Sequence, residues 1–280
     1  MNKLIAIAGS GWGFRAAYDS LKNKFDAIEL VTQEDTENLN KRPVDVLLND
    51  IEEIKSELLV CAGFKPIISS SFLLSKTVVN IHYSLLPKYR GFHSAVWAIL
   101  NNEEYLGYTI HLMNENIDDG PILYQYKKKN NQEWTATDFM EHFNAQVSKV
   151  LGSVILNYLE GSLKPKKQNK KLATWVGKRG KQHCMVDFNK SFDYTKRFFR
   201  ALVNPYPLPY FVCKGIEYEI ISFELISINT ISEPGRILNI EENGIYVSMP
   251  EGYFLIKKLA KNGKMVGFKE FKIGLYLNKV

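Results

Sequence analysis

The sequence predicts an α/β protein with a Rossmann-like, mostly parallel sheet, followed by a small β-barrel of the oligonucleotide-binding type. Over about the first 100 residues, short apolar runs alternate with helix-like segments, which is typical of a doubly wound sheet. A long amphipathic segment and then a basic, apolar-poor stretch follow at 134–171. Further on, short strand-like runs are punctuated by Gly and Asn, which favours a small barrel.

Each element of the first sheet has a local signature. The run LIAIAG at 4–9 is apolar and ends in glycine, as expected of a buried parallel strand. Further strands are predicted at 26–32, 44–50 (a short helix is the alternative), 57–63, 77–82, 107–114 and 122–128. Helices are predicted at 14–23, 94–102 and 134–161. Thr135 and Asp138 resemble a capping box at the start of the last helix.

The C-terminal third has a different pattern. A helix is predicted at 192–202 and a proline-rich turn at 204–211. The barrel strands are predicted at 216–226, 235–240, 244–249, 252–259 and 271–277. The predicted organisation is therefore a catalytic domain at 1–161, a basic linker at 162–190 and a barrel domain at 191–280.

Composition limits the class of protein. The 280 residues are 45% hydrophobic with a net charge of +6, so a folded protein with a mild preference for anionic partners is expected. Three widely spaced cysteines give neither a disulfide framework nor metal-ligand spacing, so no metal is expected. The N-terminal apolar run is too short for a signal peptide, and no run has membrane-spanning length. We expect a cytoplasmic protein with no membrane partner.

Polar residues at the end of the predicted 77–82 strand indicate chemistry. Asn80 and His82 lie two residues apart there, and the turn ENIDDGP supplies Asp118 and Asp119 after a second strand. The carboxyl ends of parallel strands form the usual ligand-binding edge. A neutral histidine near a carboxylate is a general base, and a carboxamide can stabilise an oxyanion. These residues fit acyl transfer to an amine, although a purely structural pair at a strand end is the alternative.

Two segments resemble a known family. NIHYSLLPKYRG at 80–91 and NENIDDGPIL at 114–123 resemble the folate-dependent formyltransferases, whose pattern is N-x-H-x-S-L-L-P followed by an L-D-x-G-type loop. Ile117 replaces the leucine of that loop. The resemblance implies that Asn80, His82 and Asp118 are catalytic and that N10-formyltetrahydrofolate donates the formyl group. Asp119 falls on a variable position of the pattern and is given no catalytic role.

The resemblance also implies a folate pocket. ELLVCAGFKPIIS at 57–69 resembles the strand and loop that line it, so the pterin is expected against Pro66, Ile67 and Ile68. Backbone contacts to the pterin are expected from Asn114, Glu115 and Asn116. A plain strand-to-helix loop is the alternative for 64–68.

The C-terminal third limits the choice of formyl acceptor. It resembles the barrel domain of methionyl-tRNA formyltransferases and of some sugar formyltransferases. Residues 33–43 leave little room for the insertion of the tRNA enzymes, and +6 is a modest charge for an RNA binder. These points favour a nucleotide-sugar N-formyltransferase acting on a dTDP- or UDP-linked 4-amino-4,6-dideoxyglucose type of sugar for surface glycan (O-antigen, lipopolysaccharide) synthesis. Lys88, Tyr89 and Arg90 would contact the diphosphate or sugar. The methionyl-tRNA enzyme is the alternative, and the family suggests a homodimer.

Two rival interpretations belong to other classes. AGSGWGF at 8–14, with Glu29 further on, suggests a dinucleotide site, but the glycine motif is incomplete. The barrel suggests a non-catalytic nucleic-acid-binding protein in which Tyr206, Tyr210 and Phe211 stack on bases.

Overall fold

The computed structural model describes residues 3–34 and 39–279, which fall into two compact units. The first unit comprises the chain up to Ala98 and Glu103–Lys178, and the second comprises Ile99–Asn102 and Arg179 onward. In the described part of the chain, no helix combines the length and apolar character needed to cross a membrane. The domain boundaries predicted at 161 and 190 stay predictions, although the structure groups residues 162–178 with the first unit.

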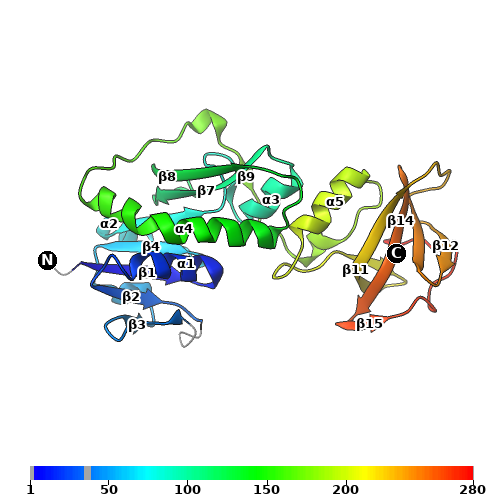
Figure 1. Cartoon of the computed structure of the whole chain (residues 1–280), viewed down its shortest axis with the longest axis horizontal. Coiled ribbons are helices and arrows are strands. Elements are labelled where there is room, and N and C mark those ends of the chain that lie inside the picture. The colour runs from blue at the N-terminus through cyan, green and yellow to red at the C-terminus, as the bar shows by residue number, and fades with distance from the viewer. Residues whose placement is uncertain (1–2, 35–38, 280) are drawn as a thin grey trace. The chain divides into compact units, whose positions relative to one another are not determined.

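A seven-stranded, mostly parallel sheet forms the centre of the first unit (Figure 1). Its strands are β1 (Leu4–Gly9), β2 (Ala27–Val31), β3 (Val46–Leu48), β4 (Leu58–Ala62), β5 (Thr77–His82), β7 (Tyr105–Leu112) and β8 (Ile122–Lys129). The strand order is β3-β2-β1-β4-β5-β7-β8. The pairs from β3 to β5 are parallel, and β7 and β8 add antiparallel pairs. The predicted α/β fold class is confirmed.

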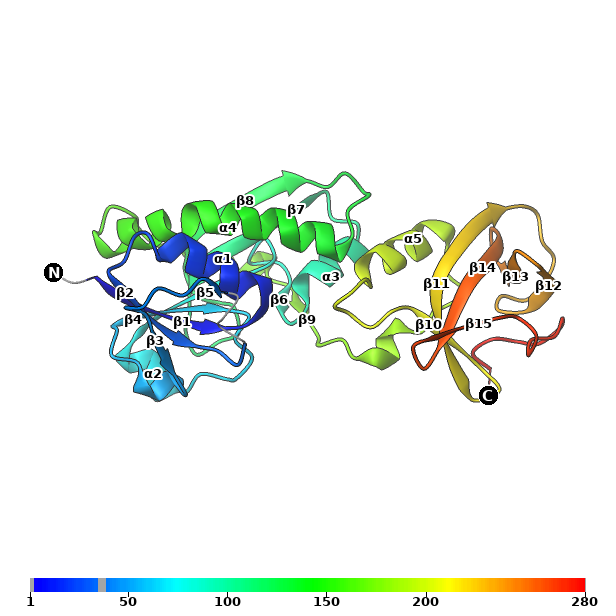
Figure 2. The same cartoon turned by 60° about the horizontal axis from the view of Figure 1, so that its bottom comes forward.

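Helices cover both faces of this sheet. They are α1 (Gly11–Leu21), α2 (Ser70–Ser75) and α4 (Ala136–Leu159). The chain also forms α3 (Ser94–Leu100) and short 3-10 turns at Ile51–Glu53 and Lys170–Leu172. The chain moves in opposite directions from β1 to β2 and from β4 to β5, so right-handed crossovers place α1 and α2 on opposite faces (Figure 2). Helix α1 packs along α4, where Gly152 donates its N–H to Ser20. Thr135 and Asp138 form the predicted capping box of α4.

The glycine-rich turn after β1 is required by close packing of the backbone against β4. A Cβ on Gly9 would lie 1.9 Å from the carbonyl oxygen of Ala62, so only glycine lets the chain pass β4 at this point. The carboxylate of Glu29 is buried and accepts the backbone N–H groups of Lys55 and Ser56. Glu29 therefore cannot take the ribose-binding role of the dinucleotide interpretation.

The basic segment after α4 returns to the sheet and binds it through its backbone. Ile122 and Lys166 exchange two backbone hydrogen bonds, each 2.8 Å long. Further on, β9 (Trp175–Val176) pairs in parallel with β6 (Arg90–Gly91). We call residues 166–176 the strap. The strap needs no apolar run, because hydrogen bonds of its backbone hold it to the sheet.

The second unit is built around an antiparallel sheet (Figure 1). It contains a 3-10 turn (Lys181–Cys184), α5 (Phe192–Ala201), β10 (Tyr210–Cys213), β11 (Ile216–Ser227), β12 (Ile237–Glu241), β13 (Gly244–Met249), β14 (Gly252–Lys261) and β15 (Lys264–Val266). The order is β10-β11-β14-β13-β12, and β15 pairs with β14. The strand predicted at 271–277 is wrong. That segment turns instead, and backbone hydrogen bonds join the C-terminal residues to both edge strands. Ile237 donates its N–H to the carbonyl of Leu275, and Asn278 donates its N–H to the carbonyl of Val212.

The aromatic residues proposed to stack on bases belong mostly to the core of this unit. Phe211 has no exposed surface and Tyr210 is 6% exposed. The ring of Phe211 stacks on Tyr218. Neither ring is available to a nucleic acid, so this part of the binding-module interpretation is wrong.

Candidate active site

Two neighbouring strands bring three polar side chains together. Asn80 and His82 are alternate residues of β5, so their side chains leave the sheet on the same face. Asn80 lies directly opposite His111 of β7 in the antiparallel register. The carboxamide nitrogen of Asn80 is 3.3 Å from Nε2 of His111. Both histidines are buried, and their rings meet edge to face.

The loop after β7 carries Asp118 to this group. One carboxylate oxygen lies 3.5 Å from Nδ1 of His82 and accepts the N–H of Gly91 at 2.8 Å. The other lies 3.4 Å from the carboxamide nitrogen of Asn80 and 3.5 Å from Nε2 of His111. Asp118 has a φ of +50°, a left-handed conformation that costs energy for a residue with a side chain. The loop therefore holds this carboxylate in place against a local strain.

The hydrogen bonds of His82 decide which of its nitrogens can act as a base. Its Nε2 is 2.8 Å from the carbonyl oxygen of Tyr89, which can only accept a hydrogen bond. Nε2 therefore carries the hydrogen when the ring is neutral. The lone pair is then on Nδ1, beside the carboxylate of Asp118. A proton taken up at Nδ1 would be stabilised at once by that carboxylate.

Burial and charge set the protonation states. Burial lowers the pKa of His82, although the nearby charge of Asp118 opposes this effect. Burial acts in the opposite sense on Asp118, but His111, His82 and the N–H of Gly91 outweigh it and hold the pKa of the carboxyl at about 2. At neutral pH the site therefore combines an uncharged imidazole with an ionised carboxylate. That combination suits a general base.

His111 was missed in the sequence. The sequence predicts a strand at GYTIHLMN (107–114), and the histidine within it gives no separate indication of a functional role. Its 1% exposure and its place opposite Asn80 follow only from the pairing of β7 with β5.

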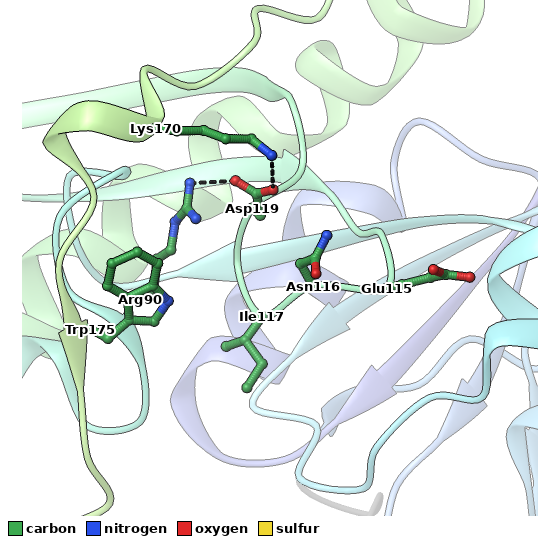
Figure 3. Close-up of a pocket in the computed structure, with 7 residues that line it drawn as sticks. All are labelled: Arg90, Glu115, Asn116, Ile117, Asp119, Lys170 and Trp175. Carbon is green, nitrogen blue, oxygen red and sulfur yellow. Dashed lines mark ion pairs between the residues drawn. The ribbon is translucent and has the colours of Figure 1, made fainter.

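A cavity of about 470 Å³ lies beside the loop that carries Asp118 (Figure 3). Its lining residues are Arg90, Glu115, Asn116, Ile117, Asp119, Lys170 and Trp175. Figure 3 shows Arg90 and Lys170 directed at the carboxylate of Asp119, with separations of 2.6 and 3.1 Å. Burial tends to raise the pKa of Asp119, but Lys170 and Arg90 lower it overall. The guanidinium also lies over the ring of Trp175.

The predicted substrate contacts fare differently from one another. Arg90 is buried and lines the cavity. Lys88 and Tyr89 both bind Glu103, through an ion pair of 3.0 Å and a hydrogen bond of 2.7 Å from the phenol. Tyr89 is 8% exposed. It contributes to the site through its carbonyl oxygen, which accepts a hydrogen bond from Nε2 of His82.

Some of the predicted folate contacts line the cavity, and others do not. Glu115 and Asn116 line the cavity, and the side chain of Asn114 caps the turn by accepting the N–H of Asn116. Ile68 packs into the core with Phe72, whereas Ile67 is 96% exposed. Pro66, Ile67 and Ile68 are not among the residues that line the cavity. Within residues 3–34 and 39–279, no cluster of His, Cys, Asp and Glu side chains is arranged to hold a metal ion.

Comparisons with known proteins agree on the family. The model described as "Formyl transferase" matches residues 4–155, and "Formyl transferase, C-terminal domain" matches residues 178–275. A methionyl-tRNA formyltransferase of Wigglesworthia glossinidia brevipalpis is 29% identical over 95% of this chain and 83% of its own length. One from Clostridium acetobutylicum is 29% identical over 85% of this chain and 75% of its own length.

A solved structure has the same fold at lower identity. It is an N-formyltransferase from Helicobacter canadensis in complex with folinic acid and dTDP-3-aminofucose. Its TM-score is 0.67 at 20% identity, over 93% of this chain and all of the other.

The expectation of a nucleotide-sugar acceptor is overturned by the sequence relatives. They are methionyl-tRNA formyltransferases, and their similarity extends over most of this chain. The sugar enzymes are similar in fold, at about 20% identity. The short segment at 33–43 favours a sugar acceptor only through its length, and its residues 35–38 lie outside the described residues. Net charge is also a weak guide to the acceptor, because it sums the whole surface, whereas an RNA contact is local.

The family assignment rests on both parts of the chain. The first model covers more than half of the residues and includes Asn80, His82 and Asp118, and the second covers most of the second unit. The protein is an enzyme of the formyl transferase family.

Proposed function

We propose that this protein transfers a formyl group from N10-formyltetrahydrofolate to the α-amino group of methionyl-tRNA. The observation that carries the proposal is the similarity to methionyl-tRNA formyltransferases, which runs through both units and reaches 95% of the chain. The arrangement of Asn80, His82 and Asp118 supports acyl transfer to an amine independently of the names of the relatives.

The geometry supports a direct transfer. The uncharged amine of the methionyl group attacks the formyl carbon, and a C–N bond forms as the carbonyl oxygen becomes an oxyanion. Asn80 donates a hydrogen bond to that oxyanion. Nδ1 of His82 accepts the proton of the attacking amine, and Asp118 stabilises the resulting imidazolium. The bond between the formyl carbon and N10 then breaks, and His82 returns the proton to N10 as it leaves.

Residues at two loops are proposed to hold the donor. Ile67 and Pro66 are exposed on the loop that follows β4, and apolar side chains suit one face of a pterin. The backbone of 114–116 is proposed to hydrogen-bond the polar edge of the ring. The Helicobacter canadensis enzyme, which has the same fold, is in complex with the related folinic acid.

Local charge near the site supports an RNA acceptor. The segment 164–171 has exposed lysines at positions 164, 166, 167, 170 and 171. Its Lys166 pairs through the backbone with Ile122 at the start of β8, and Lys170 forms an ion pair with Asp119 in the loop that carries Asp118. Exposed ammonium groups next to this loop suit the phosphates of an acceptor stem.

The proposal is tested by supplying formyl-labelled N10-formyltetrahydrofolate with purified methionyl-tRNA and measuring label on the aminoacyl-tRNA. Uncharged tRNA, which lacks the amine, is the matched control. A nucleotide-linked 4-amino sugar serves as the competing acceptor. We expect label on methionyl-tRNA alone. Turnover with the sugar at a higher kcat/KM than with methionyl-tRNA would refute the proposed acceptor but leave the chemistry intact.

A further inference from the structure

We infer that Gln168 of the strap is a positioning residue for the catalytic carboxylate of Asp118. The inference rests on the proposed function, because it gives Gln168 a role in the same reaction. Gln168 lies 50 residues beyond Asp118 in the chain and touches its loop only through the tertiary structure.

The carboxamide of Gln168 is fully engaged. Its nitrogen donates one hydrogen bond to the carbonyl of Asp118 and one to the carbonyl of Gly120, both 2.8 Å long. Its oxygen accepts from the guanidinium of Arg90 at 2.7 Å. Both N–H groups and the oxygen are therefore used, and the two donors grip the main chain on either side of Asp119.

The backbone of the loop that carries Asp118 needs additional contacts to keep its conformation. Asp118 is held in a left-handed conformation, and a residue in that region keeps it only when surrounding contacts impose it. The contacts of the carboxylate with Gly91 and the histidines fix its far end, but they do not fix the backbone. Gln168 fixes the backbone, so that the carboxylate oxygens stay within 3.5 Å of His82 and His111.

The chemistry of the side chain is specific. A glutamate would have almost the same size and would still accept from Arg90, but it has no N–H to donate and would face two carbonyl oxygens. A methionine would fill the space without any hydrogen bond. Both substitutions therefore remove the two N–H donors while keeping the volume of the side chain, so a loss of activity can be attributed to the donors.

The test compares Gln168→Glu and Gln168→Met with the same two substitutions at Gln182, an exposed glutamine of the second unit. The full chain is assayed for kcat and KM, and the pKa of Asp118 is followed by NMR of 13C-labelled carboxyl groups, assigned with Asp118→Asn. We expect both Gln168 variants to lose about 10- to 100-fold in kcat, the scale of a misplacement of catalytic groups, with little change in KM. We expect the pKa of Asp118 to rise from about 2 towards its ordinary value.

The NMR measurement needs no acceptor, so it separates this inference from the proposed function. If methionyl-tRNA is not the acceptor, the pKa of Asp118 still moves in the Gln168 variants. Parental kcat and an unmoved pKa in either folded variant would overturn the positioning role. If neither variant folds, Gln168 is required for folding rather than for positioning, and the inference is equally wrong. The Gln182 variants should match the parent in both measurements.

Discussion

At the residue scale, the site depends on how burial and hydrogen bonds together set the charge of two groups. Desolvation disfavours the charged form of His82 and also of Asp118, but only Asp118 has enough hydrogen bonds to remain ionised. The result is a neutral base beside a fixed negative charge. An imidazole with this neighbour can accept a proton during the reaction without carrying one beforehand.

The protonation state gives a prediction for the pH dependence. Because burial lowers the pKa of His82 below 6.5, the group stays neutral and active as the pH falls through that value. We expect an NMR titration of the His82 imidazole in the free enzyme to give a pKa below 6.5, whereas the acid limb of kcat/KM also reports the amine of the acceptor, whose ordinary pKa is about 7.7–8.0. Asp118→Asn removes a charge that raises the pKa of His82, so the pKa of the imidazole should move still lower. An imidazole pKa at or above 6.5 in the parent would contradict the neutral state assigned to His82.

The imidazole itself is tested by His82→Ala. A positioned general base contributes about 10²- to 10⁴-fold, so kcat should fall by that factor. The carbonyl of Tyr89 loses its donor, and about 1–3 kcal/mol of stability should be lost with it. Circular dichroism and a thermal melt check that the protein still folds. His183→Ala, at an exposed position of the second unit, is the control and should keep full turnover.

The carboxamide has its own test in Asn80→Ala. Removal of an oxyanion donor costs about 10²- to 10³-fold in kcat, and the same range is expected here. The loss should be in kcat with KM for both substrates retained, since the donor acts on a charge that exists only in the transition state. An unchanged kcat would remove Asn80 from this role.

At the element scale, the loop from β7 to β8 is tightly packed at its base. Leu112 at the end of β7 donates its N–H to the carbonyl of Pro121, which closes the base of the loop. A Cβ on Gly120 would lie 1.8 Å from the carbonyl oxygen of Leu112. The loop can thus return across the sheet only with glycine at this position.

This packing predicts the effect of Gly120→Ala. The added methyl has no room, so the free energy of unfolding should fall by about 1–3 kcal/mol or more, and kcat should fall with it. Gly177→Ala is the matched control, because nothing lies within 4 Å of its added Cβ. Urea denaturation measures the free energy of unfolding of both variants, and a turnover assay measures their kcat. Equal stability of the two variants would show that the loop can relax.

At the scale of the whole molecule, the strap makes a basic segment part of the catalytic unit. Its backbone pairs with β6 and with the start of β8, and its lysines stay exposed. A segment of this kind can present positive charge close to the reacting groups. The homodimer expected from the family stays a prediction that sedimentation can test.

The proposed acceptor implies a dependence on salt. If the lysines of 164–171 bind phosphates, log KM for methionyl-tRNA should rise with log salt concentration, because binding releases the counterions of the RNA. Each lysine that neutralises a phosphate should add about 1 to the slope, so Lys171→Met should lower it by about that amount. The KM for the folate donor is the control and should vary much less with salt. A slope near zero in the parent would argue against an RNA acceptor.

The strands of the central sheet could be predicted because most of them have a local apolar signature. The strand at 77–82 coincides with β5, and Thr135 with Asp138 caps α4 as predicted. The strand predicted at 271–277 failed because Phe271 and Leu277 are buried by turns and edge contacts rather than by pairing along a strand, while Ile273 is exposed. Composition alone cannot distinguish these two ways of burying a short apolar run.

The sequence by itself determined the family and the residues proposed for catalysis, because their spacing is a local property of two short segments. Only the tertiary structure decided that His111 and Gln168 join them, and which nitrogen of His82 is free. These facts depend on strand register and on a return of the chain over 50 residues. Side chains that meet only through pairing and packing leave no signal in the spacing of residues along the chain.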